Sequence, residues 1–447
     1  MASHDLHKDQ LVPTESHTFP VERDNTVSHE PLHQPTVSRG ASDAGPPPDG
    51  GLLAWLHVAG GFMLFFNSWG ILNTFGVFQT YYESGTLFAA SSSEISWIGA
   101  VQAFLLLLVG FLVGPVYDRG HLRLLLAVGS FAVVFGHMML SICTEYWQAM
   151  LSQGFCIGIG AGCLFVPCIS ILPTYFSRKL GLAVGLASSG SSIGGVIYPI
   201  VLDQSLSRIG FAWSVRVLGF IALGTLLMPL VVMRMRVTPP RLRAFFDWSA
   251  FVDLPFMFFV VATLIGFMGM ATLLFYLSFY AANTNTTDAR MAFYIVSIFN
   301  TASCLGRVLP NALSDITGPF NIMAPCAIVT GILAFCMIPA RGSEASLIAL
   351  TVLAGFFSGV FVSMPAVCFV PLTRDKSMIG TRIGMGCGMM AFGLLIGGPG
   401  AGAILGTSEP LSWPALWLYC GVSTCASGLM YTALRLYRSG LKLSSKV

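Results

Sequence analysis

Long apolar runs dominate the sequence after residue 51 and limit what the chain can fold into. Each run is about 20 residues long, which is the length at which an α-helix crosses the hydrocarbon core of a bilayer. Because lipid offers the backbone no hydrogen-bond partners, a spanning segment must satisfy its own N–H and C=O groups, as a helix does. The runs therefore predict an all-α membrane protein. Spans are expected near residues 53–78, 95–116, 122–142, 147–172, 181–202, 213–233, 251–279, 291–311, 322–340, 346–369, 380–403 and 413–435.

The composition agrees with this class and argues against several others. Hydrophobic residues make up 55% of the chain and charged residues only 10%, unlike a soluble domain. The net charge is +3 without a basic stripe, so no nucleic-acid partner is expected. The eleven cysteines lie mostly inside apolar runs, and no Cys or His spacing indicates a metal or cofactor. No phosphate-binding loop and no paired catalytic groups are found, so neither an ATP-driven pump nor an enzyme is expected.

The positive charges predict an orientation in the membrane. Eighteen of the 23 Lys and Arg residues fall in the tail, in the loops of one side and in the C-terminal segment, whereas Arg208, Arg290 and Arg341 fall on the other side. Basic loops stay in the cytosol, so both termini are expected there. Asn285, in an Asn-Thr-Thr sequon, would then face outside as a candidate glycosylation site. The expected parts are a disordered cytosolic tail (1–51), a six-helix bundle (52–233), a cytosolic linker (234–250), a second six-helix bundle (251–435) and a cytosolic end (436–447).

The two halves of the chain repeat each other at an offset of about 200 residues, which is typical of a duplicated six-helix unit. The Gly-rich stretch 158–162 of span four matches 355–359 of span ten, and Asp118 matches Asp315. Arg178 matches Arg374 in the same register. Glycines one turn apart in spans five and eleven predict close helix packing, which serves either packing alone or also the sliding of one bundle on the other. The main candidates are Gly185, Gly190, Gly194, Gly388, Gly393 and Gly397.

Two loops carry a motif known from one large class of transporters. Gly114-Pro-Val-Tyr-Asp118-Arg119-Gly120 closes span two, and Asp315-Ile-Thr-Gly318 closes span eight. Both resemble the Gly-x-x-x-Asp-Arg-x-Gly loop of the major facilitator superfamily. The resemblance implies two pseudo-symmetric six-helix bundles and a cytosolic latch in which the Asp pairs with an Arg. Asp118, Arg119 and Asp315 are the gating candidates, and a plain charged turn between helices is the alternative.

Three further stretches are Pro47-Pro-Asp49-Gly-Gly before Trp55, Tyr175-Phe-Ser-Arg178-Lys-Leu-Gly-Leu-Ala183 with Ser188-Ser-Gly190-Ser191, and Asn300-x-x-Ser303-x-x-Gly306-Arg307. The first resembles the entry motif of the monocarboxylate transporter family, and the other two resemble the fungal branch of that family. This resemblance implies alternating-access transport of a small organic anion, often with a proton. In the proton-coupled members a Lys of helix one and an Asp one turn before the Arg of helix eight share the proton and the carboxylate. Here Asn73 or Leu72 stands in place of the Lys, and Ser303 stands in place of the Asp.

Arg307 is therefore the leading candidate for substrate binding. An Arg inside an apolar run is costly, and its planar fork suits a carboxylate. The alternative is that Arg307 snorkels toward the cytosol or pairs with Asp315. Further candidates for the translocation path are Asn73, Asn300, Ser303, Asn67 and Trp69.

The expected function is secondary active or facilitative transport of a small organic solute, with a monocarboxylate or another organic anion favoured. An exporter of a secondary metabolite is the close alternative, and a non-transporting membrane sensor is a second class. A proton or a counter-anion is a candidate co-substrate. The plasma membrane is the expected location, with the vacuolar membrane as the alternative.

Overall fold

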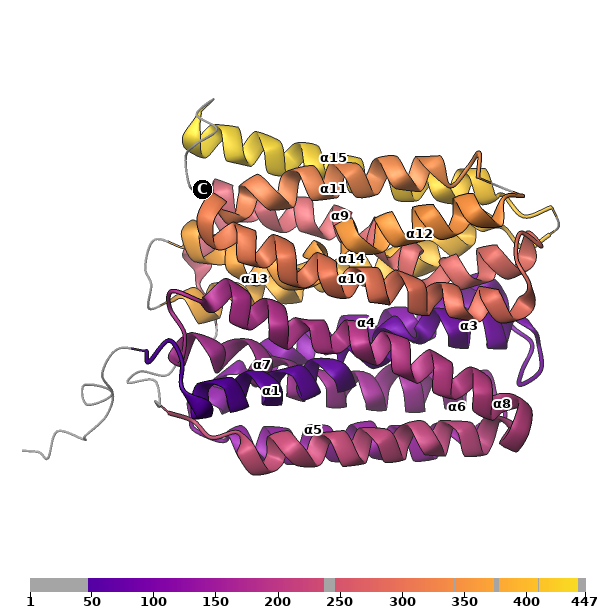
Figure 1. Cartoon of the computed structure of the whole chain (residues 1–447), viewed down its shortest axis with the longest axis horizontal. Coiled ribbons are helices and arrows are strands. Elements are labelled where there is room, and N and C mark those ends of the chain that lie inside the picture. The colour runs from indigo at the N-terminus through magenta and orange to yellow at the C-terminus, as the bar shows by residue number, and fades with distance from the viewer. Residues whose placement is uncertain (1–46, 237–245, 341, 374–377, 409, 441–447) are drawn as a thin grey trace, which may run out of the picture. The chain divides into compact units, whose positions relative to one another are not determined.

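The computed structural model describes residues 47–236, 246–340, 342–373, 378–408 and 410–440. The described residues belong to one compact unit, and helices make up its secondary structure (Figure 1). The predicted tail over 1–46, the linker core 237–245 and the end 441–447 lie outside the described residues.

The helices of the first half are α1 (Leu52–Asn67), α2 (Trp69–Asn73), α3 (Phe75–Glu83), α4 (Ser92–Asp118), α5 (Leu122–Leu140), α6 (Tyr146–Ala149), η1 (Met150–Ile157), α7 (Gly158–Ser170), η2 (Leu172–Thr174) and α8 (Leu180–Val232). Those of the second half are η3 (Trp248–Phe251), α9 (Leu254–Asn283), α10 (Ala289–Thr317), α11 (Pro319–Cys336), α12 (Glu344–Ser358), α13 (Val360–Leu372), α14 (Ile379–Leu405) and α15 (Trp413–Ser439).

The helices account for the twelve expected passes. Ten helical segments of the described chain are long and apolar enough to cross a bilayer. One of them, α8, is a helical hairpin, because Gly210 interrupts it with a left-handed φ of 72°. α15 is less apolar, yet its 27 residues pack against α9 and α11 along the second half. The all-α expectation is thus confirmed.

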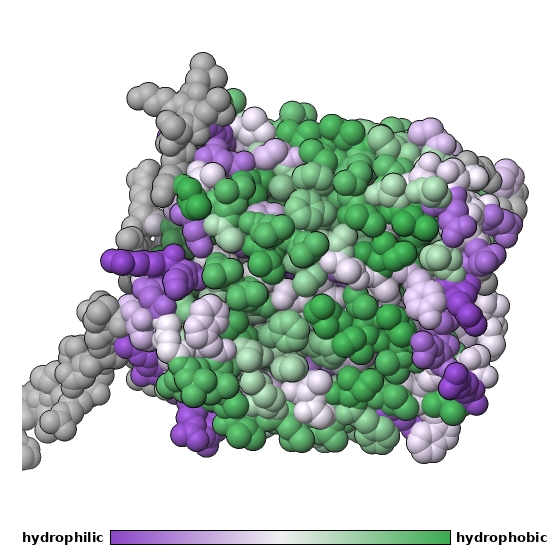
Figure 2. Space-filling model, in the orientation of Figure 1, coloured by the Kyte–Doolittle hydropathy of each residue, from purple (hydrophilic) through white to green (hydrophobic). Residues whose placement is uncertain are grey.

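The surface carries an apolar band between two polar ends. Figure 2 shows hydrophobic residues over the middle of one face and hydrophilic residues at both ends of the helices. Large apolar side chains are exposed on this band, including Phe131 at 69% and Phe220 at 55%. In water such exposure would be unfavourable, whereas lipid tails solvate it. Helix sides that face lipid therefore need no protein partner.

Glycines let helices approach closely inside each half. A Cβ atom on Gly194 of α8 would lie 3.0 Å from the Gly70 Cα of α2. A Cβ atom on Gly397 of α14 would lie 2.7 Å from the Met268 Cα of α9. Gly190 against Phe62 and Gly393 against Leu264 repeat the relationship one turn away. The fifth and first passes of one half thus pack as the eleventh and seventh passes of the other do.

Two helix pairs join the halves to each other. α8 packs along α10, where a Cβ atom on Gly185 would lie 3.0 Å from the Arg307 carbonyl oxygen. α4 packs along α14, where a Cβ atom on Gly388 would lie 3.4 Å from the Phe111 ring. Small residues thus occupy the surfaces on which the two bundles meet.

The N-terminal motif is ordered, so the predicted disordered tail ends before residue 51. The Asp49 carboxylate accepts hydrogen bonds from the Ser177 N–H (2.6 Å), the Ser177 hydroxyl (2.8 Å) and the Arg178 N–H (2.8 Å). The backbone N–H of Asp49 donates to the Tyr175 carbonyl at 3.0 Å. These bonds, led by the one from the Ser177 N–H, lower the pKa of Asp49 to about 2. The start of α1 is thereby fastened to the loop before α8.

The second half has a comparable fastening before α9. Asp247 accepts from the Arg382 Nε at 2.8 Å, and Asp253 accepts from the Arg382 Nη1 at 2.6 Å. Partial burial alone would raise the pKa of Asp247, but the hydrogen bonds of Ser249 and Arg382 outweigh it and lower that pKa. We call the end of the bundles where α1 begins and α15 ends the terminal end, and the opposite end the far end (Figure 1). Both fastenings lie at the terminal end.

Candidate functional site between the two bundles

A stripe of buried polar side chains runs along α10, at the depth of the apolar band. Asn300, Ser303, Arg307, Asn311 and Ser314 recur at steps of three or four residues and therefore share one helix face. All five are buried. The stripe faces the small, hydroxyl-rich side of α8, which keeps the two bundles close.

Arg307 is the only charged member of this stripe and is 1% exposed. Its Nε donates to the Ser303 hydroxyl at 3.3 Å, and its Nη1 donates to the Ser188 carbonyl at 3.3 Å and to the Ser191 hydroxyl. Ser188 and Ser191 belong to the opposite bundle. Among the described residues no carboxylate lies within ion-pair distance of Arg307, whereas Arg382 has two. The guanidinium is therefore a buried cation held by neutral groups alone.

Asn73 of α2 joins the same cluster. Its Nδ2 donates to the Ser191 carbonyl at 3.3 Å, while its Oδ1 has no partner in the described part of the chain. Ser68 and Thr74 interrupt the first pass on either side of α2, so that pass is made of three short helices. Broken helices at mid-membrane are typical of transporter binding sites. The structure brings Arg307, Ser303 and Asn73 together around Ser191.

Asn300 and Asn67 lie farther from this cluster. The Asn300 Nδ2 donates to the Val296 carbonyl at 2.9 Å, and its Oδ1 is buried without a partner among the described residues. Asn67 is fully engaged inside the first bundle, where its Oδ1 accepts from the Tyr198 hydroxyl at 2.7 Å and its Nδ2 donates to Thr225 at 2.9 Å. The Asn300 side chain lies against Gly195 of α8. Asn67 has the contacts of a residue that bridges two helices.

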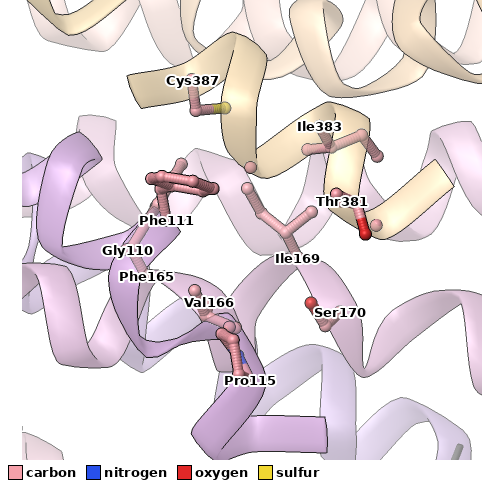
Figure 3. Close-up of a pocket in the computed structure, with 13 residues that line it drawn as sticks. Gly110, Phe111, Pro115, Phe165, Val166, Ile169, Ser170, Thr381, Ile383 and Cys387 are labelled. Atoms are coloured by element: carbon pink, nitrogen blue, oxygen red, sulfur yellow. The ribbon is translucent and has the colours of Figure 1, made fainter. Parts of the chain in front are cut away.

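A cavity of about 50 Å³ lies between the bundles, toward the terminal end. It lies among the last turns of α4, the end of α7 and the first turns of α14, as Figure 3 shows. Its walls are mostly apolar and include Phe111, Phe165, Ile169 and Cys387. The Phe165 ring also lies 6.3 Å from the ring of Trp69, centroid to centroid. The cavity thus adjoins the first pass.

The far end is closed by contacts between the bundles. The rings of Phe75 on α3 and Phe275 on α9 lie 4.9 Å apart, edge to face. The Tyr276 hydroxyl lies 3.4 Å from the Ser92 carbonyl and 3.2 Å from the Gly398 carbonyl. The contacts of α8 with α10 close much of the terminal end as well. Both ends are therefore closed by contacts between the bundles, and the cavity of about 50 Å³ lies on the terminal side.

The gating candidates lie at the terminal end. The Asp315 carboxylate accepts from the Gly181 N–H of α8 at 3.2 Å, so its described partner across the bundles is a helix N-terminus and not an Arg. Asp118 is buried at the end of α4, and Arg119 is exposed. At the far end, Asn285 is exposed in the turn between α9 and α10 with a φ of 50°.

Several polar residues of the interior escaped the sequence analysis. Ser188 and Ser191 entered it only as part of a family motif, and their contacts with Arg307 depend on a pairing of helices that is far apart in sequence. Gln102 is a single amide within the apolar run of α4, and both of its side-chain polar atoms are buried without a described partner. A lone polar residue at mid-span is itself a signal, and it could have identified Gln102.

The comparisons with known proteins agree with this architecture. The sequence profile described as Major Facilitator Superfamily matches residues 58–370, which is more than half of the chain. The chain belongs to the major facilitator superfamily. This membership and the all-helical structure make it a multi-pass membrane transporter with a small-molecule substrate.

Two relatives from one fungus match most of the chain. The MFS-type transporter dbaD of Emericella nidulans is 62% identical over 382 residues, which cover 86% of either chain. The aspyridones efflux protein apdF of the same fungus is 36% identical over 384 residues, covering 86% of this chain and 76% of the relative. The nucleoside transporter NupG superposes with a TM-score of 0.65 at 16% identity over 86% of this chain and 99% of its own, which shows a shared fold.

Proposed function

We propose that this transporter exports a small anionic secondary metabolite by alternating access. The observation that carries the proposal is the buried Arg307, which has neutral hydrogen-bond partners and no carboxylate among the described residues. A buried cation without a counter-charge is costly, and an anionic substrate would supply that charge. A guanidinium fork also matches a carboxylate in geometry. The name of the relative apdF, an aspyridones efflux protein, supports export over uptake.

The position of Arg307 explains how substrate would drive the conformational change. With no substrate bound, Nη1 of Arg307 bonds to Ser188 and Ser191 and thereby ties α10 to α8. An arriving carboxylate is a stronger acceptor for the same N–H groups. It would take over these donors and release the tie between the bundles. Release of the tie would let one bundle rock against the other, and opening of the far end would require the Phe75 and Phe275 rings to separate.

The same arrangement bears on energy coupling. Proton-coupled relatives share the proton between a Lys and an Asp, and here those positions hold Asn73 or Leu72 and Ser303. Because an Arg does not release its proton at physiological pH, Arg307 itself supplies none. We therefore propose uniport or anion exchange in place of strict proton coupling. His137 is the alternative proton carrier, and its Nδ1 lies 2.8 Å from the Val133 carbonyl inside α5.

The finer classification and the location belong to the same proposal. The Pro47-Pro-Asp-Gly-Gly motif, which is fastened to the loop before α8, supports a place in the monocarboxylate transporter-like branch. The basic loops support an orientation with the terminal end in the cytosol, and the family resemblance supports the plasma membrane, with the vacuolar membrane as the alternative. Asn285 would then face outside, exposed to glycosylation. The parts proposed are the tail, two six-helix bundles, the linker and the C-terminal end.

The experiment that tests export compares metabolites inside and outside the producing cells. Deletion of the gene should raise the ratio of intracellular to extracellular concentration for at least one anionic metabolite. The wild-type gene should restore the ratio, and Arg307→Ala at equal abundance should not. A neutral metabolite as the only one affected would contradict the role of Arg307. A sensor would change metabolite production without changing this ratio.

A further inference from the structure

The second candidate for substrate recognition lies on the first bundle, apart from Arg307. The indole Nε1 of Trp69 and both polar atoms of the Gln102 amide are buried and have no hydrogen-bond partner among the described residues. Trp69 is 2% exposed and Gln102 is 0% exposed. An unpaired polar atom in an apolar interior is unfavourable, and native structures contain few of them. Two such residues in one region need an explanation.

Packing contacts place these residues at a similar depth in the membrane. Gly99 of α4 packs against the ring of Phe75, which fixes the level of α4 relative to the first pass. Gln102 follows Gly99 by one helical turn toward the terminal end, a rise of about 4.5 Å. Trp69 precedes Phe75 by six residues in the same direction, a rise of about 9 Å if that interrupted stretch is treated as helical. The two side chains therefore differ in depth by about one turn.

This region also adjoins the cavity between the bundles. The Phe165 ring lines the cavity and lies against the ring of Trp69. A Cβ atom on Gly110, another wall residue, would lie 3.0 Å from the Phe165 ring, and Gln102 is two turns farther along the same helix. Phe165 and Trp69 offer flat apolar surface, while Trp69 and Gln102 add two kinds of donor and one acceptor. The combination suits an aromatic ring with a neutral polar substituent.

We propose that Trp69 and Gln102 form a neutral subsite that binds a hydroxyl or carbonyl group on an aromatic ring of the substrate. Arg307 would hold the carboxylate of the same molecule, so this inference rests on the proposed function and specifies its substrate as a hydroxylated aromatic acid. The subsite belongs to the first bundle and Arg307 belongs to the second. A ligand that reaches both would therefore join the bundles in the occluded state.

The test uses two probes that differ in one hydroxyl group. Purified wild-type protein is titrated with 4-hydroxyphenylacetate and with phenylacetate, and the two dissociation constants are compared. The wild type should bind the hydroxylated probe about 10-fold more tightly, since the hydroxyl satisfies partners that are otherwise unpaired. Gln102→Met keeps the length of the side chain and should reduce the preference to about twofold or less. Trp69→Phe keeps an aromatic ring, removes the N–H and should reduce the preference in the same way.

Two further variants separate this inference from the proposed function. Ser130→Ala removes another buried, unpaired hydroxyl, on α5 within the first bundle, and should leave the preference as in the wild type. Arg307→Ala should weaken the binding of both probes by a similar factor. If that variant binds both probes normally, the anion site is wrong even if the preference for the hydroxyl persists. Equal binding of the probes by the wild type, no binding of either, or a preference that survives in Gln102→Met and Trp69→Phe would overturn the subsite.

Discussion

The Asp315 carboxylate at the end of α10 accepts a hydrogen bond from the Gly181 N–H in the first turn of α8, 3.2 Å away. The contact joins the two bundles at the terminal end and sets a negative charge against the positive end of a helix dipole. By the internal repeat, Asp118 occupies the matching position at the end of α4. The Asp315 contact therefore has the geometry of a latch that favours closure of the terminal end.

Asp315→Asn should weaken this latch and open the terminal end more often. Loss of a charge at a helix N-terminus costs about 0.3–1 kcal/mol, which corresponds to a change of about two- to fivefold in the open population. Cys387 lines the cavity between the bundles, so its rate of maleimide labelling, followed by mass spectrometry, reports opening. Labelling should be about two- to fivefold faster than in the wild type. Asp203→Asn, near the far end of the first half of α8, is the control, and an equal rate in all three proteins would contradict the latch.

Gly194→Leu and Gly397→Leu should abolish transport. A side chain at either position would push apart helix backbones that lie closer than a leucine permits. Gly224→Leu is a matched control on α8, because no atom of a neighbouring residue lies within 4 Å of a Cβ at Gly224. Flux per molecule of folded protein should be normal in Gly224→Leu and lost in the other two. Normal flux in either interface variant would show that its helix pair tolerates separation.

The fastening at Asp49 should be insensitive to pH over the physiological range. Its pKa is about 2 in the folded protein, below the usual value of an Asp, so the stabilisation is present above the unfolded pKa and is lost as the pH falls toward 2. Trypsin cleavage after Arg178 or Lys179 in the purified protein, divided at each pH by the rate on an unstructured peptide of the same sequence, should therefore be equally slow at pH 6 and pH 8. Asp49→Ala should speed cleavage at both values. Faster cleavage of the wild type at pH 6 would mean that another group controls this loop.

The orientation proposed from the basic loops predicts which epitopes are accessible. Tags at either terminus should resist protease added to intact cells, because this orientation places both ends in the cytosol. A tag inserted at Asn285 should be digested, because the turn between α9 and α10 is exposed at the far end. Digestion of a terminal tag from outside would show that the proposed orientation is wrong.

The sequence predicted the class of fold well because hydropathy and length constrain a membrane chain strongly. The broken helix at Ser68 was not predicted, since it depends on backbone geometry at a single residue, whereas the two passes that meet at Gly210 were expected as spans near 181–202 and 213–233. The site was predicted in part. Arg307 stood out as a charge in an apolar run, whereas its partners Ser188 and Ser191 became visible only once α8 lay against α10. Asn67 was predicted to line the translocation path, but its side chain is engaged by hydrogen bonds to Tyr198 and Thr225. Its position in the sequence could not reveal these bonds.

The most direct measurement of the central claim is anion flux through Arg307 variants in proteoliposomes. The anion identified by the export comparison is supplied on one side, and initial rates are compared at equal amounts of inserted protein. Arg307→Ala should lower the apparent affinity by about 100-fold or more, because the charge and the whole donor set are lost. Arg307→Lys should keep part of the affinity, since it keeps the charge but not the planar fork. Wild-type flux of the anion in Arg307→Ala would contradict the account.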